Sequence, residues 1–380
     1  MSSIELLIQN PNPFRMDLAE ARRLRFDAIK DSFIHHYSNN AIYRRFCDKY
    51  NVNPGAVRNE TDLVRIPLLP SDFFKELSTS QDPDDIKKII SVPQDRIFTY
   101  FTTSGTTGKA SKYPFDRKSL QTINLSNTKI FADVGSVRED DHIIMLTPPP
   151  TESATGLVQG MYMCMKALLK SDDKIKFAIR SGIFDEKLTT EMILATEAER
   201  THLFGPPFMI NALADYVLGT RNRLRLGKGS KVFMSGGWKR VEGEINKDEL
   251  YRKTVKAIDI QLEDVRDGLG LTDIFTILLE CEHHKKHVPP WLHVSIRNTA
   301  ALSEEMELGS PGLIAFMSPL IESYPAFVIT GDMGQKMHEE KCTCGRIGPT
   351  IEYLRRADGL AARGCAIVLD SAIKAMRTTS

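Results

Sequence analysis

The sequence predicts an α/β fold, and three observations support this prediction. The chain has 380 residues, enough for a large core, and its 42% hydrophobic and 26% charged residues are ordinary for a globular protein. Short apolar runs alternate with helix-length amphipathic segments from about residue 119 to 234. Such alternation favours a sheet with parallel strands, helices packed on it, and ligands at the carboxyl ends of the strands.

The elements are expected in the following order. Residues 17–50 are predicted to be helical, because Leu24, Ile29 and Phe33 recur near helical spacing with charges between them. Residues 51–71 contain three prolines and are predicted to form loops and short elements. Helices are then expected at 119–134, 157–169, 188–198 and 207–217, and strands at 141–146, 177–179, 201–204 and 231–234. Strand-like runs at 291–296 and 312–317 predict a smaller β-rich portion.

Charge and targeting signals exclude several classes of protein. Lys and Arg number 50 against 49 Asp and Glu, so no overall field attracts nucleic acid or a membrane surface. No apolar run approaches the roughly 20 residues that cross a bilayer, and the first residues lack the basic and apolar regions of a secretory signal. We therefore expect a cytoplasmic protein whose six cysteines are reduced.

The segment from residue 103 to 112 contains the clearest chemical signal. It includes Thr103, Ser104, Gly105, Thr106, Thr107, Gly108, Lys109 and Lys112. Accessible backbone amides, short hydroxyls and ammonium groups are what a polyphosphate requires. The spacing is not that of a Walker A loop, which has four residues between its glycines. The alternative interpretation is a flexible surface turn.

This segment resembles the phosphate-binding loop T-S-G-[ST]-T-G-x-P-K of the adenylate-forming superfamily, with Ala110 in place of proline. The resemblance implies the N-terminal core of such enzymes, in which mixed sheets and helices are joined by a smaller β-rich subdomain. It also implies ATP and Mg²⁺ as cofactors, and activation of a carboxylic acid as an acyl-adenylate. Lys112 or Lys109 would then stabilise charge that develops on the phosphates.

Later segments match the superfamily in the same order. Several residues would contact the nucleotide: Ser235, Gly236 and Gly237 at the adenine, Gly270, Leu271 and Thr272 near the phosphate, and Asp332 of Thr-Gly-Asp at the ribose. Asp273 replaces the usual glutamate and would bind Mg²⁺, since a carboxylate oxygen suits a hard cation. Arg346 and Arg356 correspond to arginines of the phenylacetate-CoA ligase branch and are weaker candidates for nucleotide contacts.

The resemblance also implies a domain division with a truncated C-terminal lid domain. We expect a core at 1–355, with the main nucleotide-binding part at 100–275 and the β-rich part at 276–355, followed by a hinge and short remnant at 356–380. Only 22 residues follow Asp358, too few for the rotating lid of ordinary acyl-CoA ligases. In this the chain is similar to the acyl-protein synthetases of bacterial luciferase fatty-acid reductase systems.

Cys365 stands where those synthetases carry an acyl-accepting cysteine. A thiolate captures an acyl-adenylate and forms a thioester that remains reactive, and Arg363 would lower the pKa of the Cys365 thiol. The resemblance implies a fatty acid substrate and an acyl reductase or other acyl-accepting partner. The alternative for Cys365 is a buried structural cysteine before the apolar run that follows it.

A separate set of residues predicts a structural metal. Cys281, His287, Cys342 and Cys344 offer three thiols and an imidazole, which suits a closed tetrahedral Zn²⁺ site. His283 and His284 compete with His287 for the imidazole position. The alternative is a set of reduced cysteines in a turn beside a solvated loop.

Two other functions remain open at this point. An acid–CoA or carrier-protein ligase would use a soluble thiol and leave Cys365 incidental, whereas a non-catalytic nucleotide-binding subunit would bind ATP without releasing pyrophosphate. The sequence does not name the acid, and self-association is left open. Apolar residues near 204–209 and 155–160 are candidate walls for the acyl tail, and equally candidate core.

Overall fold

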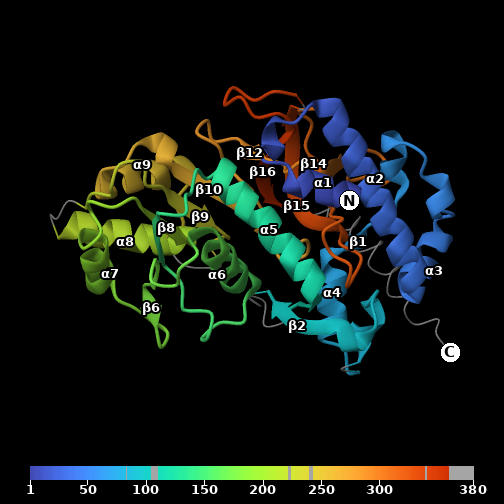
Figure 1. The fold of residues 1–380 in the computed structure, drawn as a ribbon, viewed down its shortest axis with the longest axis horizontal. Helices are drawn as coiled ribbons and strands as arrows, with labels where there is room; N and C mark the ends of the chain where they lie inside the picture. Colours follow the sequence, from blue (N-terminus) through green and yellow to red (C-terminus); the bar gives the residue numbers. More distant parts are fainter. Residues whose placement is uncertain (83, 104–109, 221–223, 239–242, 339, 359–380) are drawn as a thin grey trace. The chain divides into compact units, whose positions relative to one another are not determined.

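The structure is a computed structural model, and it describes residues 1–380 except 83, 104–109, 221–223, 239–242, 339 and 359–380. The chain forms two compact units (Figure 1). Unit 1 comprises Met1–Ser126, Leu271–Thr276 and His287–Ser380, and unit 2 comprises Asn127–Gly270 and Ile277–Lys286. No helix among the described residues is both long and apolar enough to cross a membrane.

Unit 2 is built on a six-stranded sheet with the order β11-β10-β9-β8-β4-β5. The pairs β4–β5, β4–β8, β8–β9 and β9–β10 are all parallel. Its strands are β4 (His142–Met145), β5 (Ile175–Phe177), β8 (Thr201–Gly205), β9 (Val232–Ser235), β10 (Val265–Leu271) and β11 (Thr276–Leu279), and a small hairpin of β6 (Ile179–Arg180) and β7 (Ile183–Phe184) accompanies them.

Helices lie on both faces of this sheet, because its strands are apolar on both sides. Val232 and Met234 of β9 pack in one core with α7 (Glu186–Leu194), α8 (Pro207–Gly219) and α9 (Lys247–Ile258). Phe233 points to the opposite face and meets Phe131 of α5 (Arg117–Asp133) edge to face at 5.4 Å. Next to α5 lies α6 (Gly156–Leu169), where Cys164 is 4.0 Å from Thr128 of α5.

Unit 1 contains a second six-stranded sheet with the order β12-β16-β15-β14-β13, and β1 pairs with β15 from outside this path. The pairs β13–β14, β14–β15 and β15–β16 are antiparallel, whereas β1 runs parallel to β15. The strands are β1 (Leu69–Pro70), β12 (Lys286–His287), β13 (His293–Arg297), β14 (Gly312–Met317), β15 (Phe327–His338) and β16 (Thr350–Arg356).

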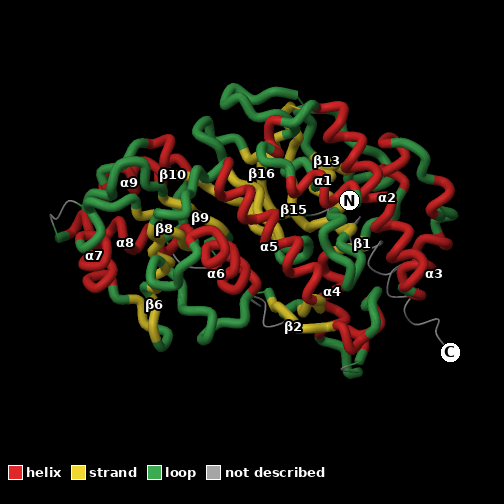
Figure 2. Tube along the Cα trace, viewed as in Figure 1, coloured by secondary structure: helices red, strands yellow, loops and turns green. Residues whose placement is uncertain are grey.

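Helices of unit 1, drawn with the sheet strands in Figure 2, pack on this sheet through aromatic side chains. Phe33 of α2 (Leu18–Asn39) and Tyr43 of α3 (Ala41–Lys49) both contact Phe327 of β15. The unit also holds α1 (Ser3–Gln9), α4 (Ser71–Ser78) and an antiparallel hairpin of β2 (Ile97–Thr102) and β3 (Lys112–Asp116). Short 3₁₀ helices occupy Pro13–Arg15, Pro54–Ala56, Glu60–Arg65, Asp85–Ile89 and Gln94–Arg96 in unit 1 and Leu262–Asp264 in unit 2.

The predicted rhythm of strands and helices is confirmed from α5 to β9, with boundaries shifted by a few residues. The helical structure predicted for residues 17–50 is confirmed, and Asn40 divides it into α2 and α3. The backbone of Asn40 is extended, and its side chain accepts a hydrogen bond from the Tyr43 N–H, which caps the second helix. The long strand β15 was not predicted, although its segment Thr330–Asp332 was interpreted chemically.

Candidate functional site

The predicted phosphate-binding segment follows β2 and precedes β3. Thr103 and Ser111 close its base: the Thr103 N–H donates to the Ser111 carbonyl and the Ser111 N–H donates to Thr103 Oγ1, both at 3.0 Å. Lys112 is exposed, and its N–H donates to Ser78 Oγ at 2.7 Å. Ser104, Gly105, Thr106, Thr107, Gly108 and Lys109 lie outside the described residues.

Asp273, the predicted magnesium ligand, lies at the tip of the hairpin formed by β10 and β11. Its carboxylate Oδ1 accepts a hydrogen bond from the Tyr113 hydroxyl at 2.7 Å. Burial raises the pKa of the Asp273 carboxyl, and the negative charge of Asp332 raises it further, while the Tyr113 hydroxyl opposes this shift. The two predicted carboxylates therefore lie close enough to influence each other within unit 1.

Asp332, the predicted ribose ligand, lies inside β15 opposite Arg356 of β16. Arg356 Nη1 donates to Asp332 Oδ1 at 2.7 Å, and the Arg356 guanidinium lies against Gly331. The Asp332 side chain is largely buried while that of Arg356 is 71% exposed. The carboxylate is thus fixed by the sheet, whereas its arginine partner can move to solvent without breaking a buried contact.

Four other predicted nucleotide residues, Ser235, Gly236, Gly237 and Gly270, lie in unit 2, at or near the carboxyl ends of its strands β9 and β10. Ser235 ends β9 opposite Gly268 of β10, and Gly236 follows with a positive φ of 91° that favours glycine. Ser235 is fully buried, and its Oγ has no hydrogen-bond partner among the described residues. A Cβ on Gly270 would come within 2.9 Å of this hydroxyl, so the glycine leaves the strand ends open.

The other residues predicted to bind the nucleotide or to accept the acyl group lie elsewhere in the chain. Leu271 and Thr272 lead from β10 into the turn with Asp273. Arg346 is buried in a turn far along the chain, where its carbonyl accepts the Cys342 N–H at 2.8 Å. Cys365 lies outside the described residues.

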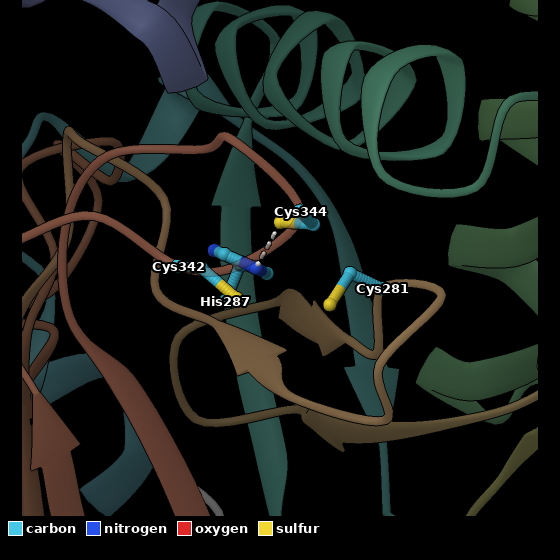
Figure 3. Close-up of side chains that lie close together, drawn as sticks. All are labelled: Cys281, His287, Cys342 and Cys344. Atoms are coloured by element: carbon cyan, nitrogen blue, oxygen red, sulfur yellow. Dashed lines mark hydrogen bonds between the residues drawn. The ribbon is translucent and has the colours of Figure 1, made fainter.

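The four predicted metal ligands do come together (Figure 3). One ligand atom from each of Cys281, His287, Cys342 and Cys344 lies within 4.8 Å of every other. The Cys344 Sγ is 3.3 Å from His287 Nε2, and three of the four residues are buried. Among the residues described, the group includes His287 and neither His283 nor His284.

Two tight turns present these ligands. Bridges between Glu280 and Lys286 and between Lys341 and Ile347 close the turns. Within the second turn, Gly345 has a positive φ of 86° and its N–H donates to the Cys342 carbonyl at 2.9 Å. Three sulfurs and one nitrogen are a donor set that fits Zn²⁺.

Sequence reasoning missed two groups that the structure brings to these sites. Tyr113 and Tyr324 surround Asp273, and Glu280 anchors the turn that carries Cys281. Tyr113 lies in β3 between Lys112 and Pro114, and no motif in the sequence of that strand singles it out.

Comparison with known proteins adds the family context. The family described as "Acyl-protein synthetase, LuxE" matches residues 1–374. A long-chain-fatty-acid–luciferin-component ligase of Vibrio harveyi is 26% identical over 98% of this chain and 94% of its own. The enzyme of the same name from Aliivibrio fischeri is 24% identical over 98% and 95%.

Solved structures show the fold. A 2-hydroxyisobutyryl-CoA ligase, in complex with 2-HIB-AMP and CoA in the thioesterification state, superposes with a TM-score of 0.73 at 17% identity. The superposition covers 92% of this chain and 70% of that one. The predicted fold class, an adenylate-forming ligase core, is therefore confirmed.

Proposed function

Because this chain belongs to the acyl-protein synthetase (LuxE) family, whose members are ligases, we propose that it activates a long-chain fatty acid with MgATP and then acylates Cys365. The fatty acid carboxylate attacks the α-phosphorus, pyrophosphate leaves, and acyl-AMP forms. The Cys365 thiolate then attacks the acyl carbon, AMP leaves, and a thioester results. The relatives named above, which are long-chain-fatty-acid ligases by name, support the choice of acid.

The observation that supports adenylation most directly is the pair of buried carboxylates in unit 1. Asp273 and Asp332 lie near each other on fixed backbone, and each matches a superfamily position. Asp332 is suited to accept hydrogen bonds from the ribose hydroxyls, and Asp273 to bind Mg²⁺ through oxygen. When bound, Mg²⁺ would neutralise charge on the phosphates, as Lys112 and the glycine-rich segment would.

Chain length supports transfer to Cys365. Cys365 is the ninth residue after Arg356, which pairs with Asp332. An extended chain of that length reaches at most about 30 Å. We propose that residues 356–380 act as the hinge and acceptor segment after a core at 1–355, in a cytoplasmic enzyme that passes the acyl group to a partner reductase.

The test is acylation of the protein itself. Wild-type protein with MgATP and a radiolabelled long-chain fatty acid should gain hydroxylamine-sensitive label, and Cys365→Ser should lose it while still forming acyl-AMP. Cys164→Ser is the matched control, because burial raises the pKa of the Cys164 thiol to about 12 and makes it a poor nucleophile. That variant should label normally.

Other results would identify the alternatives. Pyrophosphate release that needs CoA and survives Cys365→Ser would replace this proposal with an acid–CoA ligase. Nucleotide binding without any pyrophosphate release would indicate a non-catalytic subunit.

We also propose that Cys281, His287, Cys342 and Cys344 hold a structural Zn²⁺. Their ligand atoms are close enough for one ion to contact all four, since Zn–S and Zn–N bonds are roughly 2.0 to 2.3 Å long. Metal analysis should find one zinc per chain, and Cys342→Ser with Cys344→Ser should lose it together with thermal stability. Cys47→Ser, at a buried cysteine outside the cluster, should keep the zinc. The proposal would be contradicted if the wild-type protein contained no zinc and was as stable as the same protein supplied with zinc.

A further inference from the structure

Asp273 is held by hydrogen bonds from two tyrosines outside the turn that carries it. Its side chain is largely buried, and Oδ1 accepts the hydroxyl hydrogen of Tyr113 at 2.7 Å. The backbone carbonyl of the same residue accepts a second hydroxyl, that of Tyr324, at 3.1 Å. Two tyrosines therefore fix both the side chain and the backbone of one residue.

The two tyrosines are themselves fixed by packing. Tyr113 is 1% exposed and Tyr324 fully buried, with their ring centroids 5.7 Å apart. Phe74 of α4 packs on both rings, with centroids 4.8 Å from Tyr113 and 5.4 Å from Tyr324. A hydroxyl on a ring held in this way has little freedom, so its hydrogen bond sets the orientation of the carboxylate.

A serine hydroxyl also lies beside the Asp273 carboxylate. The Ser71 hydroxyl, on the first residue of α4, lies near the Asp273 carboxyl and lowers the pKa of that carboxyl by hydrogen bonding to it. A carboxylate oxygen with a serine hydroxyl oxygen beside it is a donor set suited to Mg²⁺ or to a water bound to it.

From these contacts we propose that Tyr113 is a positioning residue for the metal-binding carboxylate: its hydroxyl holds Asp273 Oδ1 so that the other oxygen faces the Mg²⁺ of MgATP. Outer hydrogen-bond partners of this kind orient metal ligands, and their loss typically weakens metal affinity ten- to a hundredfold. Aspartate is one methylene shorter than the glutamate of the superfamily motif. Its shorter side chain has fewer rotatable bonds, so it cannot compensate for a wrong orientation of the carboxylate by adopting another conformation. The inference rests on the proposed function and adds a residue to it.

The experiment measures metal binding without turnover. Mn²⁺ binding is followed by electron paramagnetic resonance in the presence of a non-hydrolysable ATP analogue, for wild type, Tyr113→Phe and Asp273→Asn. We expect Tyr113→Phe to raise the Kd for Mn²⁺ at least tenfold while binding of the metal-free analogue stays unchanged. In the Asp273→Asn background, Tyr113→Phe should cause no further change.

Tyr43→Phe is the matched control. Tyr43 is another fully buried tyrosine of unit 1, and its hydroxyl donates to the Pro67 carbonyl at 2.9 Å, away from either carboxylate. Its loss should lower stability as Tyr113→Phe does and leave the Kd for Mn²⁺ unchanged. Tyr324→Phe, which releases the Asp273 backbone instead, serves as a second variant if Tyr113→Phe does not fold.

The outcomes separate two failures. An unchanged Kd in Tyr113→Phe and Tyr324→Phe, with a weakened one in Asp273→Asn, would overturn the positioning role and leave the proposed site intact. An unchanged Kd in Asp273→Asn would overturn the metal site on which the inference rests.

Discussion

Single buried residues make the stability of this protein depend on pH. His36 of α2 is fully buried, and its Nε2 lies 3.2 Å from the Ile321 carbonyl. Burial lowers the pKa of His36 well below 6.5, and the neighbouring His35 lowers it further. The folded protein therefore holds this imidazole neutral, whereas the unfolded chain takes up a proton once the pH falls below about 6.5.

The sign of the effect follows from this difference. Because the unfolded state binds more protons, the free energy of unfolding should fall as the pH is lowered from 7 to 5, by up to about 1.4 kcal/mol per pH unit for one such group. His36→Gln retains an N–H near the position of Nε2 without a titratable ring and should remove that part of the slope. Urea unfolding of both proteins at several pH values measures it, and equal slopes would show that His36 binds as many protons in the folded state as in the unfolded state.

At this scale the sequence identified residues that occur in short motifs and missed those that do not. Asp273 and Asp332 were predicted from their neighbours in the chain. Tyr113 lies 160 residues from Asp273, and only the fold brings the two together. The proximity of Ser71, at the start of α4, to Asp273 could not be predicted from the sequence for the same reason.

The hairpin of β10 and β11 is the element that presents Thr272 and Asp273. Glu280 fastens its open end: the Glu280 N–H donates to the Asp267 carbonyl, and its carboxylate accepts the Asp267 N–H, both at 3.0 Å. The same buried carboxylate pairs with Lys247 and Lys286 and accepts the Tyr251 hydroxyl. Burial opposes its ionisation, but these partners and His284 hold the pKa of Glu280 below its usual value.

Removing that carboxylate should therefore be costly. Glu280→Ala leaves Lys286, itself largely buried, without one of its two carboxylate partners, and should lower the free energy of unfolding by about 3 kcal/mol or more. Glu263→Ala, at an exposed glutamate of the same unit, should change it by less than about 0.5 kcal/mol. Guanidinium unfolding distinguishes them, and equal losses would show that the network adds no specific stability.

Elements were predictable where local pattern and tertiary structure agree. The strand Gly312–Met317 and the helix at 157–169 have periodicity that matches their burial, and both were predicted within a residue or so. Strand β15 was missed because Gly331, Asp332 and Gly334 favour turns locally. Pairing with β14, β16 and β1 overrides that preference.

At the scale of the whole molecule, the chain length between the sheet of unit 1 and Cys365 determines how the acyl transfer proposed above would occur. A thiol that is held within about 30 Å of Arg356 has a high effective concentration at its own site. Transfer within one chain should thus exceed transfer between chains at ordinary protein concentrations.

Self-acylation should therefore be first order. The rate constant for labelling, with saturating MgATP and fatty acid, should stay constant over a hundredfold range of protein concentration. In a mixture, Cys365→Ser protein with an intact adenylation site should not acylate an Asp273→Asn partner that keeps its cysteine. A rate proportional to protein concentration, or label on that partner, would indicate transfer between chains.

Asp332 lies inside β15, a strand with neighbours on both sides in the sheet of unit 1. The strand has β14 on one side and β16 on the other, so its amide hydrogens are shielded from solvent by neighbours rather than by a ligand. Their exchange with deuterium should require opening of the sheet itself, with or without nucleotide. Asp332, the proposed ribose ligand, would then keep its position for as long as the protein stays folded.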